Sequence, residues 1–360
     1  MKTPLLTHED RLPALLATGW GVEVAIRPLF IPIGDSAYSY RVEAVRGEHY
    51  YLKVVDRRTA VARQLAARMR KFSLPLQRHV AESELEEVGA PLPQLTRCGS
   101  LAQESGRLLL ALYSFIEGET LADAYPMSAE LVGRIGRALG RLHAVQVPEH
   151  LWRNTAVDTH LITFDERLRA DLEAISRVSA RASTWKQQLR ELVVPRLEMI
   201  RGFMSRAEQY AKRVQQLPQQ MVVCHGDLWG GNMIPAGDGR LIFLDWESAV
   251  IAPAERDAFF YLSDPSRPEF WAFVQGYQQT RGEPVQWQPA RLAYHAYRQQ
   301  LRNLAHWLHK LLHERLDEEQ RANDLEMIGF HCLDRWEGIE QATTRLMQMV
   351  NWVKCGPILS

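Results

Sequence analysis

The hydrophobic pattern near the N-terminus alternates along the chain. Between residues 22 and 55, apolar and polar positions follow one another, and Tyr40, Val42 and Ala44 share one side. The run at 50–55 continues in the same manner after a turn. Alternation of period two is typical of β-strands. We therefore expect consecutive strands in the first part of the chain.

The later part of the chain has helical spacing instead. Leu131, Ile135, Leu139 and Leu142 recur at helical intervals after Ser128, a good N-cap residue, and predict a helix that ends near His143. Further helical patterns cover residues 163–217, with a break near Val193–Pro195, then 288–314 and 316–350. Strands followed by helices favour an α+β fold.

Composition excludes several classes of protein. The 360 residues, 46% of them hydrophobic, can bury a large core, and this length suggests two lobes. With 43 basic and 43 acidic residues the net charge is zero, so neither nucleic acid nor an anionic membrane is an expected partner. Four widely spaced cysteines have no metal-ligand spacing, and no apolar run is long enough to span a membrane. We expect a cytoplasmic protein.

One short window gathers the polar residues with the clearest chemistry. Asp227, Asn232 and Asp245 stand between two apolar, strand-like runs at 221–224 and 241–244. A hairpin-like return of the chain would bring the three side chains together.

These residue types suit phosphoryl transfer, which needs positioning and charge neutralisation more than covalent chemistry. Asp245 and Asn232 offer the hard oxygen ligands that Mg²⁺ prefers. Asp227 is then free to orient an acceptor hydroxyl and take its proton. The alternative is structural, since an aspartate after a glycine is often only a turn residue.

The string from His225 to Asn232, HGDLWGGN, resembles the catalytic loop of aminoglycoside phosphotransferases and of choline, homoserine and fructosamine kinases. The strings LDWESA at 244–249 and PAERD at 253–257 are similar to the metal-binding segment of that superfamily and its downstream aspartate. The PAERD string looks closest to that of the spectinomycin-type branch. In the family this aspartate, Asp257 here, braces the catalytic loop.

The resemblance covers roughly residues 22–265 and implies a protein-kinase-like bilobal fold. Residues 1–115 would form a small nucleotide-binding lobe with an antiparallel sheet. Residues 116–360 would form a larger, mainly helical lobe for catalysis and acceptor binding. The implied activity is transfer of the γ-phosphoryl group of ATP, with Mg²⁺, to a hydroxyl of a small molecule.

On the nucleotide side, Lys53 lies in the middle of a predicted strand, where an anion such as the α- and β-phosphates of ATP would justify its partial burial. A solvent-facing lysine on an edge strand is the alternative. The turn at 33–39, with Gly34 and Ser36, stands where the family has its nucleotide-positioning loop. Only one glycine is present there, and no P-loop string occurs in the chain.

Two further nucleotide contacts follow from the resemblance. A glutamate on the helix expected at 74–88 would pair with Lys53; Glu82, Glu84, Glu86 and Glu87 are the choices, and Glu82 shares a face with Leu74. Adenine would bind at a hinge where the backbone of Tyr113, Ser114 and Phe115 reads the base. The lobe boundary would lie near residues 114–120.

The acceptor stays open at this point. A cationic aminoglycoside or aminocyclitol would call for carboxylates such as Glu247, Asp264 and Glu269 around it, and Trp229, Trp246 or Trp271 would offer a ring to stack on. A metabolic acceptor such as homoserine, choline or a sugar would need fewer charges. A noncatalytic nucleotide-binding protein is the third reading. ATP and GTP are not distinguished, and no oligomeric state is implied.

Overall fold

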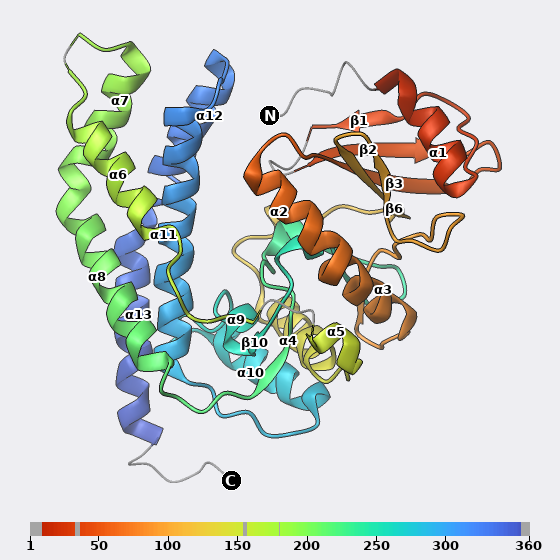
Figure 1. Cartoon of the computed structure of the whole chain (residues 1–360). Helices are drawn as coiled ribbons and strands as arrows, with labels where there is room; N and C mark the ends of the chain where they lie inside the picture. The colour runs from red at the N-terminus through yellow and green to blue at the C-terminus, as the bar shows by residue number, and fades with distance from the viewer. Residues whose placement is uncertain (1–8, 33–36, 154–156, 180, 354–360) are drawn as a thin grey trace. The chain divides into compact units, whose positions relative to one another are not determined.

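The computed structural model describes residues 9–32, 37–153, 157–179 and 181–353 (Figure 1). The chain divides into two compact units. Unit 1 comprises Met1–Val157, Met221–Ile251 and Gln275–Glu283, and unit 2 comprises Asp158–Gln220, Ala252–Val274 and Pro284–Ser360. The lobe boundary expected after residue 115 falls inside unit 1 and stays a prediction.

Unit 1 contains an antiparallel sheet of five strands in the order β1-β2-β3-β6-β5, as the alternating pattern predicts. Its strands are β1 (Leu29–Ile31), β2 (Tyr38–Glu43), β3 (His49–Asp56), β5 (Gln103–Ser105) and β6 (Leu108–Ser114). Lys53 lies on the central strand β3, opposite Ser39 on one side and Ala111 on the other. It is therefore not on an edge strand.

The two faces of this sheet bury different sets of side chains. Leu52 and Val54 pack on one face against Leu16 of α1 (Leu12–Trp20), which follows the short η1 (Glu9–Arg11). Val55 and Ala111 pack on the other face, in a cluster that also holds residues of the helical run after β3. Because successive side chains of a strand point to opposite faces, one strand supplies both clusters.

The helical run after β3 consists of α2 (Ala60–Arg68), η2 (Met69–Ser73) and α3 (Leu74–Glu82). The expected helix continuing to residue 88 is wrong in its last turn. Glu84 and Glu87 have φ values of 44° and 63°, which an α-helix does not accommodate. The chain turns there into β4 (Val88–Gly89).

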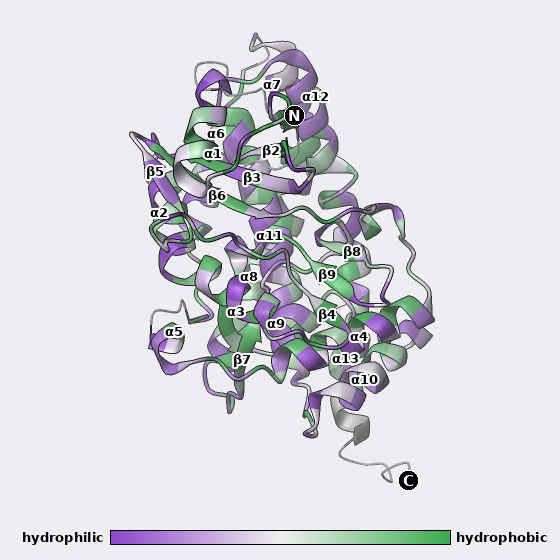
Figure 2. Cartoon of the chain, turned by 90° about the vertical axis from the view of Figure 1, so that its right-hand side faces the viewer, coloured by the Kyte–Doolittle hydropathy of each residue, from purple (hydrophilic) through white to green (hydrophobic). Residues whose placement is uncertain are grey.

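A second, three-stranded sheet supports the polar window. Strand β9 (Leu241–Phe243) pairs in parallel with β4 and antiparallel with β8 (Met233–Pro235). The expected hairpin-like return between the runs 221–224 and 241–244 is therefore wrong in its partner strand, because the chain returns to β9 from β8. Strand β7 (Met221–Cys224) pairs with β10 (Val250–Pro253), within which the chain passes into unit 2. Figure 2 shows β7 and β9 in the green of hydrophobic residues, as expected for buried strands.

Short helices and α4 complete unit 1. The predicted helix after Ser128 is confirmed as α4 (Ala129–His143), and the Ser128 hydroxyl accepts a hydrogen bond of 3.2 Å from the N–H of Leu131. The remaining elements of this part are η3 (Leu121–Asp123), α5 (Glu149–Arg153), η5 (Gly230–Asn232) and η6 (Trp246–Ser248).

Unit 2 is built mainly from long helices, and α6, α8, α11 and α13 run alongside one another in Figure 1. The elements are α6 (Asp165–Ser176), α7 (Thr184–Val193), η4 (Val194–Arg196), α8 (Leu197–Val214), α9 (Glu255–Ala258), α10 (Pro268–Arg281, which ends in unit 1), α11 (Pro289–His313), α12 (Glu318–Gly329), η7 (Leu333–Arg335) and α13 (Trp336–Val353). The predicted break near Pro195 is present. Two further helix ends, of α6 at Ser176 and of α12 at Gly329, were not predicted. Among the described residues, no helix combines the length and apolar character that crossing a bilayer requires.

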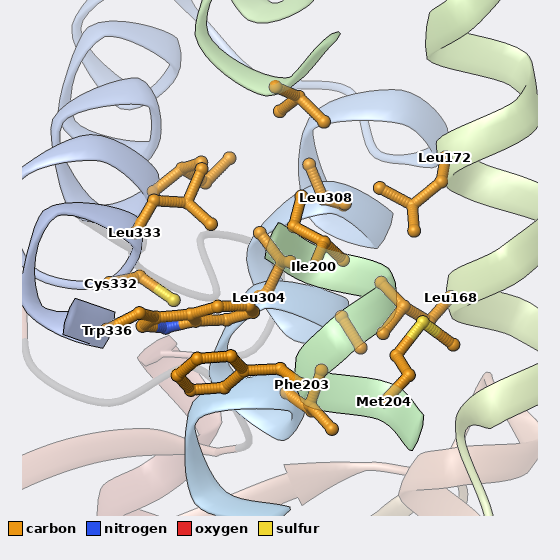
Figure 3. Close-up of a cluster of buried hydrophobic side chains, with 14 of the residues drawn as sticks. Leu168, Leu172, Ile200, Phe203, Met204, Leu304, Leu308, Cys332, Leu333 and Trp336 are labelled. Atoms are coloured by element: carbon orange, nitrogen blue, oxygen red, sulfur yellow. The ribbon is translucent and has the colours of Figure 1, made fainter. Parts of the chain in front are cut away.

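The core of unit 2 centres on an aromatic stack (Figure 3). The rings of Phe203 on α8 and Trp336 on α13 lie 4.1 Å apart, with 19° between their planes. Leu304 and Leu308 of α11 and Leu168 of α6 are buried in the same cluster. Helices far apart in the sequence are thus joined by one hydrophobic core.

Candidate active site

Two loops of unit 1 carry the polar window. The first follows β7 and runs from His225 to Asn232, and the second follows β9 and begins at Leu244. The N–H of Leu244 donates to the carbonyl of Asn232 at 2.9 Å, and Nε2 of His225 donates to the carbonyl of Leu244 at 2.6 Å. The loops are therefore fixed against each other by their backbones.

His225 anchors this junction from inside the core. Its side chain is fully buried, and its ring lies 5.0 Å from that of Trp246, edge to face. Trp246 is itself buried and donates from its indole N–H to the carbonyl of Phe243 at 2.8 Å. Both side chains hold the loops in shape, so Trp246 is a core residue and not a platform for an acceptor ring.

Gly226 permits the closest approach between the loops. Its φ is 83°, and a Cβ built there would lie 2.1 Å from the carbonyl oxygen of Ser248. Any side chain would strain the backbone and also collide with the second loop. This explains why glycine stands directly before Asp227.

Asn232 and Asp227 are linked within the first loop. The amide nitrogen Nδ2 of Asn232 donates to the backbone carbonyl of Asp227 at 2.8 Å, which leaves Oδ1 of the amide as an acceptor. The carboxylate of Asp227 is half-buried, and no hydrogen bond or ion pair ties it to another residue that the structure describes. It is thus available to an incoming hydroxyl.

Asp245 has an unusual backbone. Its φ of 60° and ψ of 64° place it in the left-handed region, which non-glycine residues rarely adopt. Such conformations cost of order 1–3 kcal/mol and concentrate at functional sites. The side chain keeps 45% of its surface exposed, so a carboxylate oxygen remains accessible.

Lys53 connects the five-stranded sheet to the second loop. Its side chain is buried, and Nζ donates to Oδ1 of Asp245 at 2.9 Å and to Oε1 of Glu247. Burial alone would lower the pKa of Lys53, but the charge and hydrogen bond of Asp245, together with the nearby Tyr51 and Tyr113, raise this pKa above its usual value. Desolvation likewise opposes ionisation of Asp245, yet the Lys53 ammonium lowers the pKa of this carboxyl group. Both groups are charged at neutral pH.

The expected pairing of Lys53 with Glu82 is corrected by this geometry. Glu82 is the last residue of α3 and pairs with Arg78 one turn earlier on the same helix. Glu86 and Glu87 pair with Arg141 and Arg137. The second anion beside Lys53 comes instead from Glu247. Its place two residues after Asp245 was the only signal in the sequence.

The expected adenine-binding hinge at Tyr113, Ser114 and Phe115 offers fewer free backbone groups than predicted. The N–H of Ser114 donates to the carbonyl of Leu92 at 3.0 Å, and that of Phe115 donates to the carbonyl of His49 at 3.2 Å. These two N–H groups are already used within the protein. The side chain of Tyr113 is buried, and its burial raises the pKa of the phenol.

Other expected contacts have different outcomes. Gly34 and Ser36 lie outside the described residues. Asp264 forms an ion pair with Arg345 through two contacts, and Glu269 forms one with Arg267. Both carboxylates that were expected to bind a cationic acceptor are therefore already paired within the protein. Trp229, on the first loop beside Asp227, is 42% exposed. It is the one of the three tryptophans that combines exposure with a place in the polar window.

A family model provides the decisive comparison. The model described as "Phosphotransferase enzyme family" matches residues 29–297. The chain belongs to this family. It is a small-molecule phosphotransferase, and the matched span contains both loops, Lys53 and all five strands of the sheet. No curated protein sequence matches the phosphotransferase significantly.

Solved structures similar to this phosphotransferase share its fold at low sequence identity. Spectinomycin phosphotransferase APH(9)-Ia, in complex with ADP and spectinomycin, is 17% identical, with a TM-score of 0.73 over 94% of this chain and 98% of that one. An amicoumacin kinase with AMP-PNP and Ca²⁺ is 16% identical, with a TM-score of 0.57 over 89% and 92%. Plasmodium vivax ethanolamine kinase is 13% identical, with a TM-score of 0.54 over 87% and 83%. The superfamily resemblance and the protein-kinase-like α+β fold are confirmed.

Proposed function

We propose that this phosphotransferase moves the γ-phosphoryl group of ATP to a hydroxyl of a small molecule, with an aminocyclitol or aminoglycoside as the first candidate. The observation that carries the proposal is the joining of two loops by the Leu244–Asn232 and His225–Leu244 hydrogen bonds. These bonds bring the segments of Asp227, Asn232 and Asp245 together.

In this proposal Asp227 is the catalytic base. Its carboxylate is half-buried and is not consumed by a partner among the described residues. It orients the acceptor hydroxyl and accepts its proton as the oxygen attacks phosphorus. A positioned base contributes about 10²- to 10⁴-fold in rate.

The donor set of Asn232 and Asp245 fits Mg²⁺. Both offer oxygen, one as a fixed amide and the other as an exposed carboxylate held ionised by Lys53. Bound there with ATP, Mg²⁺ would neutralise charge on the phosphate oxygens. The ammonium of Lys53 would bind the nontransferred phosphates. Its contacts with Asp245 and Glu247 hold the ammonium in place until the nucleotide binds.

The nucleotide base would be recognised next to β6. Since the N–H groups of Ser114 and Phe115 are already used, the carbonyl groups of Tyr113, Ser114 and Phe115 are the better candidates for contacts with the adenine amino group. This favours ATP over GTP, because guanine presents a carbonyl oxygen where adenine has its amino group.

The acceptor is proposed from two observations. Trp229 exposes an aromatic surface next to Asp227, suited to the face of a ring. The resemblance of the fold to a spectinomycin phosphotransferase supports a ring-shaped aminocyclitol.

An acceptor screen tests the proposal. The wild-type protein is incubated with γ-labelled ATP, Mg²⁺ and separate acceptors: spectinomycin, aminoglycosides, choline, ethanolamine, homoserine and simple sugars. The Asp227→Asn variant serves as the matched blank. We expect transfer to an aminocyclitol or aminoglycoside that the variant does not support. Transfer only to metabolic acceptors would overturn the acceptor class, and no transfer to any acceptor or to water would overturn the proposed function.

A further inference from the structure

Three potential metal-ligand side chains meet in unit 2, on helices that supply nothing to the two loops. Asp171 lies on α6, and His309 and His313 lie one turn apart on α11. Nε2 of His313 is 2.7 Å from Oδ1 of Asp171, and Nδ1 of His309 is 3.9 Å from Oδ2. The carboxylate therefore faces both imidazoles, one with each oxygen.

Asp171 is placed where a carboxylate is costly. The residue is only 3% exposed, and its Oδ2 has no hydrogen-bond partner among the described residues. Nδ1 of His309 is also buried without such a partner. A buried acceptor without a partner costs about 1–3 kcal/mol, so these two facing atoms require an explanation.

The spacing of the three groups approaches that of a metal site. Their ligand atoms all lie within 4.8 Å of one another, and the two imidazole rings are 4.6 Å apart. Bonds of about 2.0–2.2 Å in a tetrahedral zinc site place ligand atoms about 3.3 Å apart. Small side-chain rotations of His309 and His313, both partly exposed, would close the difference.

We propose that Asp171, His309 and His313 bind a divalent transition metal ion, Zn²⁺ in the first place. Two imidazoles and one carboxylate favour such an ion over Mg²⁺, which prefers oxygen ligands alone. The site has three protein ligands, so water completes the coordination. Its effect is to cross-link α6 to α11 and to stabilise the helical core of unit 2.

One alternative explains part of the geometry without a metal ion. A simple His313–Asp171 hydrogen bond is the competing explanation. It does not explain why Oδ2 of Asp171 and Nδ1 of His309 are buried without a hydrogen-bond partner among the described residues.

Zinc titration of the full-length protein tests the site, with a chromophoric chelator as competitor and melting temperature as a second readout. We expect one equivalent of Zn²⁺ to bind and to raise the melting temperature. Since even loss of a residue that only supports a ligand weakens metal affinity about 10- to 100-fold, His309→Gln and His313→Gln should each weaken it by at least about 100-fold. His306→Gln, an exposed histidine of the same helix, is the matched control and should change nothing.

Two outcomes would overturn the proposal. One is that the wild-type protein binds no Zn²⁺. The other is that binding is equally strong in His309→Gln, His313→Gln and His306→Gln, which would assign it to another surface. Binding of Co²⁺ adds an independent readout, because its absorption spectrum reports a tetrahedral site with nitrogen and oxygen ligands. Phosphotransfer activity does not enter this test, so it fails or succeeds independently of the proposed function.

Discussion

The ammonium of Lys53 lies 2.9 Å from Oδ1 of Asp245, a residue 192 positions later in the chain. This contact joins the central strand of the sheet to the loop proposed to bind Mg²⁺. It also means that the proposed phosphate ligand and metal ligand neutralise each other before the nucleotide arrives. When ATP and Mg²⁺ bind, their contacts with Lys53 and Asp245 have to compensate for the loss of this ion pair.

Glu247 is predicted to position Lys53 for ATP. Glu247→Gln keeps the shape of the side chain but removes the charge beside the buried ammonium. We expect KM for ATP to rise about tenfold with a small change in kcat, the equivalent of one charge-assisted hydrogen bond. Steady-state kinetics measure this. Glu198→Gln, which alters an exposed pair with Arg201, is the control and should leave KM unchanged.

Gly226 is predicted to be indispensable to the loop contact. Gly226→Ala would place a methyl group against Ser248 at positive φ, and we expect lower thermal stability together with a lower kcat. The control is Gly202→Ala on α8, where a Cβ meets no atom within 4 Å. There the substitution should stabilise the protein by roughly 0.5–1 kcal/mol. Equal effects of the two substitutions would contradict the strain argument.

The aromatic stack is predicted to dominate the stability of unit 2. Phe203→Ala would leave a cavity against Trp336, and we expect the free energy of unfolding to fall by about 3–5 kcal/mol. Chemical denaturation followed by circular dichroism measures it. Phe330→Ala removes a phenyl group that is 60% exposed and should cost no more than about 0.5 kcal/mol.

His295 is predicted to make the protein less stable in mild acid. It is buried on α11, and burial, reinforced by the charge of Arg256, holds its pKa well below the ordinary 6.5. Below pH 6.5 the unfolded chain takes up a proton that folded His295 refuses, so stability falls as pH decreases and is fully retained above 6.5. The slope contributed is at most about 1.4 kcal/mol per pH unit.

Denaturation at several pH values checks this dependence. His295→Leu should flatten it between pH 6.5 and the pH at which the folded form of His295 titrates. His306→Gln, at an exposed position, should leave the slope unchanged. A slope that survives in His295→Leu would assign the effect to another group, of which His160, also with a pKa lowered by burial, is the first to test.

Local patterns in the sequence were sufficient for several elements. The alternation around Tyr40 and Lys53 predicts the sheet, and Ser128 marks the start of α4 because N-capping depends on neighbouring residues only. The two apolar runs at 221–224 and 241–244 are confirmed as strands β7 and β9, but they lie in different sheets, and β8 was not predicted. Asp227, Asn232 and Asp245 are close in sequence, and the loops that carry them are joined by hydrogen bonds. That their side chains converge on one Mg²⁺ ion stays a prediction.

Contacts between distant residues were not predictable in the same way. Nothing local shows that Lys53 pairs with Glu247 and not with Glu82, because the choice depends on packing between β3 and a loop far along the chain. The helix break before Trp336 contains no proline. It follows Gly329, the last residue of α12, and Cys332 departs from helical geometry with φ −122° and ψ −84°. Apolar spacing continues through that break, so the pattern predicts one helix where there are two.

The most direct test of the central claim compares Asp227→Asn with the wild-type protein. Single-turnover transfer from γ-labelled ATP to the best acceptor of the screen should fall by about 10²- to 10⁴-fold. The dissociation constant for a nonhydrolysable ATP analogue with Mg²⁺ should stay within about twofold, because Asp227 contacts neither Lys53 nor the metal in this account. Transfer at the wild-type rate in Asp227→Asn would contradict it.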